Sequence, residues 1–321
     1  MSFVRTSGGS TAAKVPAGCI VSSHDGSQLV STGVSDLDFV LGGGIPIGRV
    51  LCVKEDRYTR YSNLLLRLFS SQTLESGHCL MLITDEEPES AEQAMISNLP
   101  LRCRDSSSGV RNDNIDEGEI LSADLLNPVP KRTLGAVRPS EEKMKIAWRY
   151  ERNKHISNKL GSMKISSKSS DAHPYICIFD ITKSIPKSAV SGFQEKRQLF
   201  CIKPAYTPSE LYDVIYSKIQ HGGFFKSQAS SQKPEILRIV IPSLTQLMSD
   251  ASARDCYEFL YRLRVLLRRC NACCVFSIPA YLYGDHYGLF SHHSVRSLEH
   301  LSDGVIELES FVGTPRSDII F

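Results

Sequence analysis

The chain has 321 residues, of which 41% are hydrophobic and 22% are charged, and its formal net charge is +2. This length fits one large α/β domain with inserted loops, and the apolar content excludes a chain that is disordered throughout. With 37 basic and 35 acidic residues, the surface is too balanced for general binding to polyanions. Any contact with nucleic acid must therefore be local.

Residues 1–11 are polar, and no apolar run approaches the roughly 18 residues that a membrane helix needs. We therefore expect no membrane segment, and a protein of the cytoplasm and the nucleus. The ten cysteines lie mostly in apolar surroundings, without the spacing of a secreted disulfide scaffold, and are predicted to be reduced, buried thiols.

Cys270 and Cys273 form a C-x-x-C pair, but no second pair lies at the spacing of a zinc finger. We interpret residues 270–274 as a junction between a helix and an apolar strand rather than a metal site. The other candidate metal ligands are His286, His292 and His293. We expect them to be loop residues, because no further ligands lie near them at metal-binding spacing.

The first elements in chain order are a disordered polar tail over residues 1–28 and a short helix. The helix is predicted around residues 36–41, with Ser35 or Asp36 as its N-cap and positions 37, 40 and 41 on its apolar face. The glycines of residues 42–48 then supply the left-handed backbone needed to turn into a strand over residues 49–53.

A loop over residues 54–62, a helix over 63–69 and an apolar strand over 79–83 follow. A strand, helix and second strand in this order imply a parallel sheet. From residue 101 to about residue 170 the composition becomes polar, without sustained periodicity, which indicates a partly disordered insertion.

Regular structure is predicted to resume with a strand over residues 175–180 and a helix over 209–219 that begins beside Pro208. The later predicted elements are a strand at 237–241, a helix at 255–269, a strand at 274–278 and a segment at 301–309. Buried strands that alternate with helices indicate one doubly wound α/β domain over residues 29–321, with a mainly parallel sheet and helices on both faces.

The loop between the first parallel strand and its helix lies where a nucleotide-binding protein carries the motif G-x-x-x-x-G-K-[ST]. Glu55 and Arg60 stand at the two glycine positions and Tyr61 stands at the lysine, so only Ser62 fits. Asp56 adds a second carboxylate that would repel a triphosphate, while Arg57 and Arg60 offer partial compensation as contacts to an anion.

The second ATPase signature is an aspartate after an apolar strand, and here residues 238–241 lead into Pro242 and Ser243. Both the phosphate-binding and the metal-binding residues are thus missing. Glu86 and Glu87 are candidates for a water-orienting base, although a helix cap or a solvated loop fits them better because Pro88 follows.

Two basic segments are candidates for contact with RNA. The helix at residues 257–269 carries several arginines, which an ordinary amphipathic surface helix explains better. The polar insertion combines positive charge with aromatic side chains that could stack on unpaired bases, although a charged linker is the alternative. Its candidate residues are Lys143, Lys145, Trp148, Arg149 and Arg152.

Several strings together resemble the family of the fourth Elongator subunit, also known as the PAXNEB family. They are residues 31–38, the Leu-Gly-Gly-Gly string at 41–44, residues 55–62, the Met-Lys-Ile-Ala-Trp-Arg-Tyr string at 144–150, and residues 308–313. The string at 144–150 is the most specific, because Leu-Gly-Gly-Gly alone is typical of the wider RecA-like superfamily.

The resemblance implies a RecA-like accessory subunit that joins the fifth and sixth subunits in a heterohexameric ring and works with core Elongator, including its catalytic subunit. The ring would bind tRNA and support carboxymethyl-type modification of the wobble uridine, U34. A degenerate phosphate loop is expected in this family. The resemblance still allows ATP to bind at interfaces of the assembled ring. Family members continue beyond the string at 308–313, whereas this chain ends at Phe321.

Two other hypotheses remain open at this point. The first is a divergent RecA-like ATPase that acts on its own, with Arg57, Arg60 and Ser62 on the phosphates. The second is a pure interaction protein, in which the basic insertion is only a solvated linker.

Overall fold

The computed structural model describes residues 15–22, 24–83, 98–103, 175–202, 207–227, 235–244, 252–282 and 292–312. The chain divides into two units, and every described residue belongs to the unit formed by residues 1–104 and 171–321. The other unit, residues 105–170, lies outside the described residues, and with it most of the predicted insertion.

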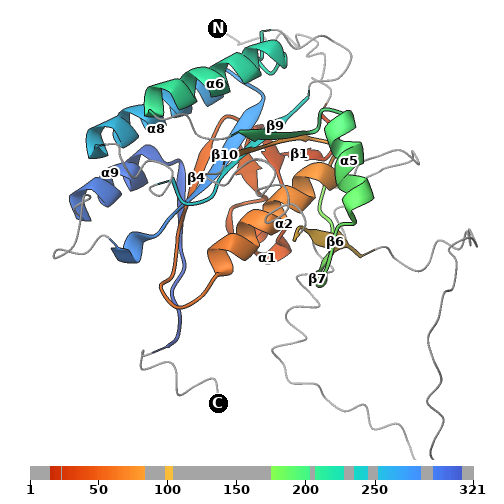
Figure 1. The fold of residues 1–321 in the computed structure, drawn as a ribbon, viewed down its shortest axis with the longest axis horizontal. Helices are drawn as coiled ribbons and strands as arrows, with labels where there is room; N and C mark the ends of the chain where they lie inside the picture. Colours follow the sequence, from red (N-terminus) through yellow and green to blue (C-terminus); the bar gives the residue numbers. More distant parts are fainter. Residues whose placement is uncertain are drawn as a thin grey trace, which may run out of the picture. The chain divides into compact units, whose positions relative to one another are not determined.

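Six of the described strands form one parallel sheet, in the order β11-β4-β10-β9-β5-β8 (Figure 1). Continuous apolar runs explain why the central strands are buried on both faces. The predicted doubly wound α/β class is confirmed. The strands are β4 (Val50–Lys54), β5 (Cys79–Ile83), β8 (Leu199–Ile202), β9 (Leu237–Ile241), β10 (Ala272–Ile278) and β11 (Gly304–Glu307).

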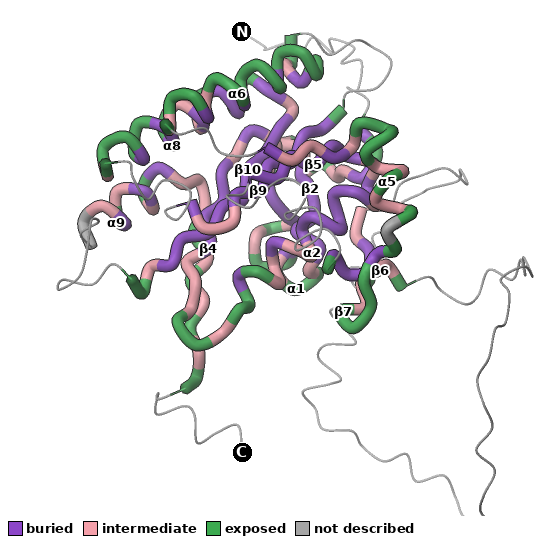
Figure 2. Tube along the Cα trace, viewed as in Figure 1, coloured by how far each residue is buried: buried purple, intermediate pink, exposed green. Residues whose placement is uncertain are grey.

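Helices cover both faces of the sheet, and each face has its own apolar cluster. On one face α6 (Pro208–His221), α8 (Ala253–Arg268) and α9 (His292–Leu301) pack on the strands. On the other face α2 (Tyr61–Glu75) and α5 (Lys187–Glu195) do so. Figure 2 shows the strands as a buried layer between helices whose outer sides are exposed.

Two helices begin with the capping chemistry that their sequences encode. Thr207 and Glu210 form a reciprocal capping box at the start of α6, with Pro208 at the first helical position. Ser252 and Asp255 form the same box at the start of α8. The expected helix entry at Pro208 is therefore confirmed.

A second sheet of three short strands precedes the parallel sheet in the chain. It contains β1 (Cys19–Val21), β2 (Gln28–Val30) and β3 (Ile45–Pro46), all antiparallel. The tail predicted over residues 1–28 thus contains a paired strand. Residues 19–21 form a strand because they pair with β2 in antiparallel register, with Cys19 opposite Val30.

Helix α1 (Ser35–Val40) differs from its prediction in two ways. Its N-cap is Val34, without a capping side chain, so the predicted Ser35 or Asp36 cap is wrong. Val40, predicted on the apolar face, is 79% exposed, while Asp38 is buried. Asp38 turns inward because it accepts hydrogen bonds from the Thr32 backbone and the Ser31 and Thr32 hydroxyls.

A separate two-stranded antiparallel sheet pairs β6 (Pro100–Arg102) with β7 (Phe179–Ser184). The strand predicted at residues 175–180 therefore begins later and does not join the parallel sheet. The sixth strand of that sheet is instead β8, at its edge. His292 and His293, expected in a loop, are the first residues of α9.

Candidate functional site

The loop between β4 and α2 lies at the carboxyl edge of the parallel sheet, as the sequence predicts. Within it Arg57, Arg60 and Tyr61 are exposed, while Ser62 is buried in the first turn of α2. The strand–loop–helix context of a phosphate site is present. The residues that fill it are long side chains instead of glycines.

Glu55 is held at the sheet edge by two residues of the neighbouring strand β10. Its backbone N–H donates to the Ile278 carbonyl at 2.8 Å, and its Oε1 accepts a hydrogen bond of 2.6 Å from the Ser277 hydroxyl. The same hydroxyl accepts from the backbone N–H of Ser243 at 2.9 Å. A chain of hydrogen bonds therefore joins the carboxyl ends of β4, β10 and β9.

This series of hydrogen bonds ends just after β9, where an ATPase carries its metal-binding aspartate. Here Pro242 follows β9, and Ser243 adopts a left-handed backbone with a φ of 52°. Its N–H points to Ser277 rather than to a ligand. The bonded set does contain one carboxylate, that of Glu55, and its Oε1 accepts a hydrogen bond from the Ser277 hydroxyl.

Asp56 helps to fold the loop onto itself. Its Oδ2 accepts a hydrogen bond of 3.1 Å from the Tyr58 backbone. Partial desolvation tends to raise the pKa of Asp56, but the Thr59 hydroxyl and the N–H groups of Ser310, Tyr58 and Thr59 outweigh it and hold the pKa below its usual value. Asp56 is thus a charged carboxylate at neutral pH.

The start of α2 retains one feature of a phosphate site. Arg60 is its N-cap residue and makes no side-chain capping bond, and the first turn carries no acidic residue. Such an end attracts anions through its free N–H groups and the helix dipole. Nothing else in the described loop adds a glycine cradle or a lysine to it.

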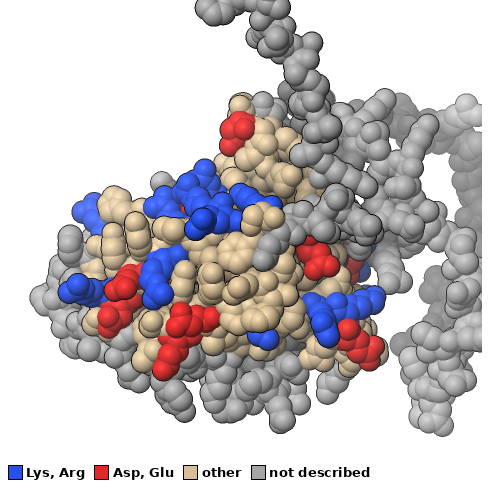
Figure 3. All heavy atoms as spheres, turned by 90° about the horizontal axis from the view of Figure 1, so that it is seen from above, with Lys and Arg blue, Asp and Glu red and all other residues tan. Residues whose placement is uncertain are grey.

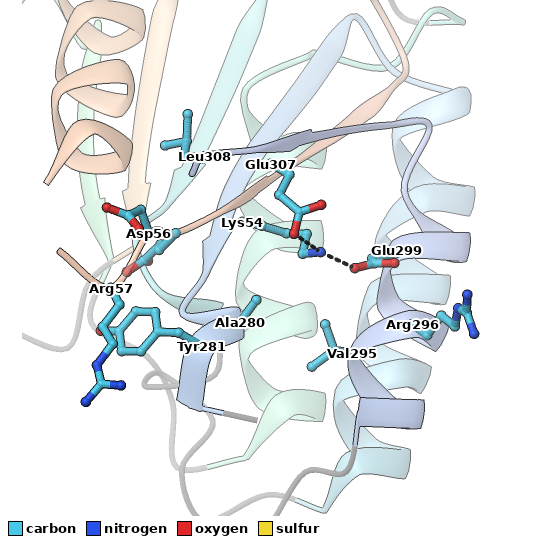
Figure 4. A pocket seen from close by; sticks show the side chains of 11 residues that line it. Lys54, Asp56, Arg57, Ala280, Tyr281, Val295, Arg296, Glu299, Glu307 and Leu308 are labelled. Atoms are coloured by element: carbon cyan, nitrogen blue, oxygen red, sulfur yellow. Dashed lines mark hydrogen bonds and ion pairs between the residues drawn. The ribbon is translucent and has the colours of Figure 1, made fainter. Parts of the chain in front are cut away.

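A cleft of about 300 Å³ opens beside the loop, between β11, η2 (Ala280–Leu282) and α9 (Figure 4). Lys54 points into it and forms ion pairs with Glu307 at 2.7 Å and Glu299 at 3.1 Å. Burial would lower the pKa of Lys54, but these two carboxylates outweigh it and raise the pKa above its usual value.

The cleft is unsuited to a polyanion. Its charged lining consists of three basic and four acidic residues, namely Lys54, Arg57, Arg296, Glu55, Asp56, Glu299 and Glu307. The charge of Lys54 is already used by its two partners. A triphosphate placed here would meet more carboxylates than free cations.

The described part of the chain contains no group of three or more His, Cys, Asp or Glu side chains that could hold a metal ion. Cys273 and Cys274 are fully buried within β10, so the interpretation of residues 270–274 as a helix-to-strand junction is confirmed. Burial raises the pKa of Cys273 to about 11, which keeps this thiol protonated and unreactive.

Several predicted site residues lie outside the described residues. They are Glu86 and Glu87 and the nucleic-acid candidates Lys143, Lys145, Trp148, Arg149 and Arg152. Conversely, sequence reasoning missed Ser277, Glu299 and Glu307. No local pattern marks them, because Ser277 is 222 residues from Glu55 and Glu307 is 253 residues from Lys54.

Fold and site together define a doubly wound α/β domain that carries Glu55, Arg60 and Tyr61 in the loop between β4 and α2, where a nucleotide-binding protein has glycines and a lysine. Residues 12–319 match the family described as PAXNEB protein, and the chain belongs to that family. Among the helices of the described segments, none has the length and apolar character to cross a bilayer.

Relatives of known name agree with this assignment. The chain is 31% identical to Elongator complex protein 4 of Xenopus laevis, over 91% of this chain and 68% of that protein. It is 29% identical to Elongator complex protein 4 of Homo sapiens, over 94% of this chain and 68% of that protein. For the protein of the same name from Dictyostelium discoideum, the identity is 26%, over 94% of this chain and 65% of the relative.

Proposed function

We propose that this chain is a non-catalytic accessory subunit of Elongator. In this proposal it joins the fifth and sixth subunits in a heterohexameric ring that binds tRNA and supports carboxymethyl-type modification of wobble uridine. The main support is similarity to proteins named Elongator complex protein 4 over more than nine-tenths of the chain. Catalysis would belong to another subunit of Elongator.

The condition of the phosphate loop supports the non-catalytic part of the proposal. Phosphoryl transfer requires positioned phosphates and a metal, and the loop supplies neither a glycine cradle nor a lysine. Glu55 is engaged with Ser277 instead of leaving space for a phosphate. We expect the isolated chain to show no ATP turnover above that of a mock preparation.

The first test is the native mass of the chain co-expressed with the fifth and sixth Elongator subunits. We expect a six-membered heteromeric assembly, with the chain expressed alone as the control. Absence of any association would overturn the ring-subunit proposal. ATP turnover by the isolated chain that is lost in Glu86→Gln or Glu87→Gln would instead support an independent ATPase.

The second test concerns RNA and uses the assembled complex. We expect it to bind tRNA with an affinity that falls as salt concentration rises, because phosphate contacts release counterions. Neutralising Lys143, Lys145, Arg149 and Arg152 to glutamine should weaken this binding if the insertion contacts RNA directly. Unchanged affinity in this variant would favour the solvated-linker alternative for that segment.

A further inference from the structure

Helix α8 has one solvent-facing side that combines arginines with aromatic residues. Positions four, seven, eight and eleven residues after Tyr257 lie on one side of a helix. They are Tyr261, Arg264, Val265 and Arg268, and exposed Arg254 precedes Tyr257 on the same side. Tyr257 is 43% exposed and Tyr261 is 53% exposed. Of the two acidic residues of the helix, Asp255 forms the capping box with Ser252, and exposed Glu258 borders this side four residues after Arg254.

Three arginines meet one carboxylate at the C-terminal end of this side. Nitrogens of Arg49, Arg264 and Arg268 all lie within 3.2 Å of Oδ1 of Asp303. The other oxygen of Asp303 accepts from the Val50 backbone at 3.0 Å. Asp303 is thus saturated, while each guanidinium has five N–H donors and uses one on this carboxylate.

The arginine side chains remain accessible at this cluster. Their exposed fractions are 41% for Arg49, 30% for Arg264 and 43% for Arg268, against 10% for Asp303. Exposed Lys226 and Arg269 adjoin them, and Lys226 Nζ donates to the Arg268 carbonyl at 3.1 Å. The C-terminal dipole of α8 favours some of this charge, yet five cations around one carboxylate leave a clear positive excess.

The cluster lies at the amino edge of the sheet, opposite the degenerate phosphate loop. Asp303 directly precedes β11, and Arg49 directly precedes β4. Helix α8 packs against both α6 and α9, so its exposed side is the middle of that helical layer (Figure 1). Figure 3 views the molecule from above and shows several groups of blue side chains on this face, with red side chains beside some of them.

We propose that this surface, the α8 face, is an RNA-binding site, defined by Arg49, Lys226, Arg254, Tyr257, Tyr261, Arg264, Arg268 and Arg269. Guanidinium forks bind phosphate oxygens in two-point contacts, and exposed tyrosines provide platforms on which unpaired bases stack. The ligand class is a structured RNA with accessible phosphates and unpaired bases. The inference rests on the proposed tRNA-binding function and assigns residues to it.

An acidic protein segment is the competing occupant, because tyrosine and arginine are also common at protein interfaces. RNA is favoured by the charge of the α8 face, whose defining residues include six cations, while the carboxylates beside them in the described residues are the saturated Asp303 and the exposed Glu258. The unused N–H donors of three adjacent arginines also suit successive phosphates better than isolated carboxylates.

The test measures tRNA affinity of the complex with the fifth and sixth subunits at several salt concentrations. Arg264→Gln/Arg268→Gln should weaken binding by about tenfold and make the salt dependence shallower by about one to two released ions. Arg49 remains in this variant as the partner of Asp303, which preserves the fold. Arg262→Gln on the same helix is the matched control, because Arg262 stacks on Tyr212 at 4.0 Å instead of joining the cluster.

A second variant leaves every Asp303 contact in place. Arg254→Gln/Tyr261→Ala should weaken tRNA binding by about fivefold or more through a lost phosphate contact and a lost base stack. The inference would be overturned if the wild-type complex binds tRNA and both variants bind it with the same affinity and salt dependence. The proposed function would then remain intact. No binding by the wild-type complex would overturn both. If the variants no longer assemble with the fifth and sixth subunits, and those two subunits bind tRNA as they do without this chain, the α8 face is a protein interface instead.

Discussion

Arg238 donates a hydrogen bond of 3.0 Å from Nε to Nδ1 of His78, and both side chains are buried. An arginine can only donate, so Nδ1 of His78 is the acceptor and Nε2 carries the proton, which it shares with the Ala17 carbonyl at 2.8 Å. Arg238 also donates to the Ser31 carbonyl at 2.7 Å and lies over the Phe69 ring. One buried arginine therefore joins β9 to the three-stranded sheet.

This arrangement predicts the effect of removing the arginine. Arg238→Met should fill similar space but remove the hydrogen bonds that Arg238 donates to His78 Nδ1 and to the Ser31 carbonyl. We expect the free energy of unfolding to fall by about 2–5 kcal/mol, because the loss of a donor to a buried acceptor costs about 1–3 kcal/mol. Denaturant unfolding measures this change. A variant as stable as the wild type would show that the network contributes nothing, and exposed Arg254→Met is the control.

The glycine turn before β4 supplies a matched pair of substitutions. Gly44 has a φ of 126°, and an added Cβ would contact the Val30 carbonyl and approach Tyr175 Oη to 2.6 Å. Gly42 has a φ of 79° with open space around its Cβ position. We expect Gly44→Ala to cost about 3 kcal/mol or more and Gly42→Ala about 1–2 kcal/mol. Equal costs in thermal unfolding would contradict the steric argument.

The hydrogen-bond chain at the carboxyl edge can be tested through its central hydroxyl. Ser277→Ala removes the donor to Glu55 and the acceptor for the Ser243 N–H. We expect a loss of about 1–3 kcal/mol in the free energy of unfolding, and no gain of ATP binding. Glu309→Gln, a change at an exposed position, should stay within about 0.5 kcal/mol of the wild type. If Ser277→Ala binds ATP, these hydrogen bonds alone prevent ATP from binding at the loop after β4.

The arginine cluster predicts a pH dependence of stability. Burial tends to raise the pKa of Asp303, but the Val50 N–H and the charges of Arg264 and Arg268 outweigh it and lower the pKa below its usual value. A lowered folded-state pKa contributes stability that is complete above the ordinary value of about 3.9 and is lost as the pH falls through the lowered value.

Asp303→Asn should therefore destabilise the protein by about 2–4 kcal/mol at pH 7, and the difference from wild type should shrink as the pH falls below the ordinary value of about 3.9. Urea unfolding at a series of pH values measures both quantities. Asp213→Asn, which removes a partner 3.9 Å from Arg262 on an exposed helix, should change stability by less than about 1 kcal/mol. A pH-independent difference for Asp303→Asn would exclude the ion pairs as its cause.

Elements with strong local signals could be predicted from the sequence. The strand at 79–83 is a continuous apolar run and appears with those bounds, and α6 begins at Pro208 as expected. The prediction for α1 was wrong because hydrophobic spacing places Val40 inward, whereas Asp38 has three donors in Ser31 and Thr32 that no periodicity reveals. The strand predicted at residues 175–180 was misplaced because its partner, β6, lies far away in the sequence.

By itself the sequence determined the alternation of buried strands and helices and the presence of Glu55, Arg60 and Tyr61 in the loop after β4, where a nucleotide-binding protein has glycines and a lysine. These properties depend on residue type and on neighbours a few positions away. Only the tertiary structure decided that Glu55 meets Ser277, that Lys54 lies between Glu299 and Glu307, and that three arginines meet at Asp303. Parallel strands bring side chains from distant segments to one sheet edge, and the partner of a charged group is set by that arrangement.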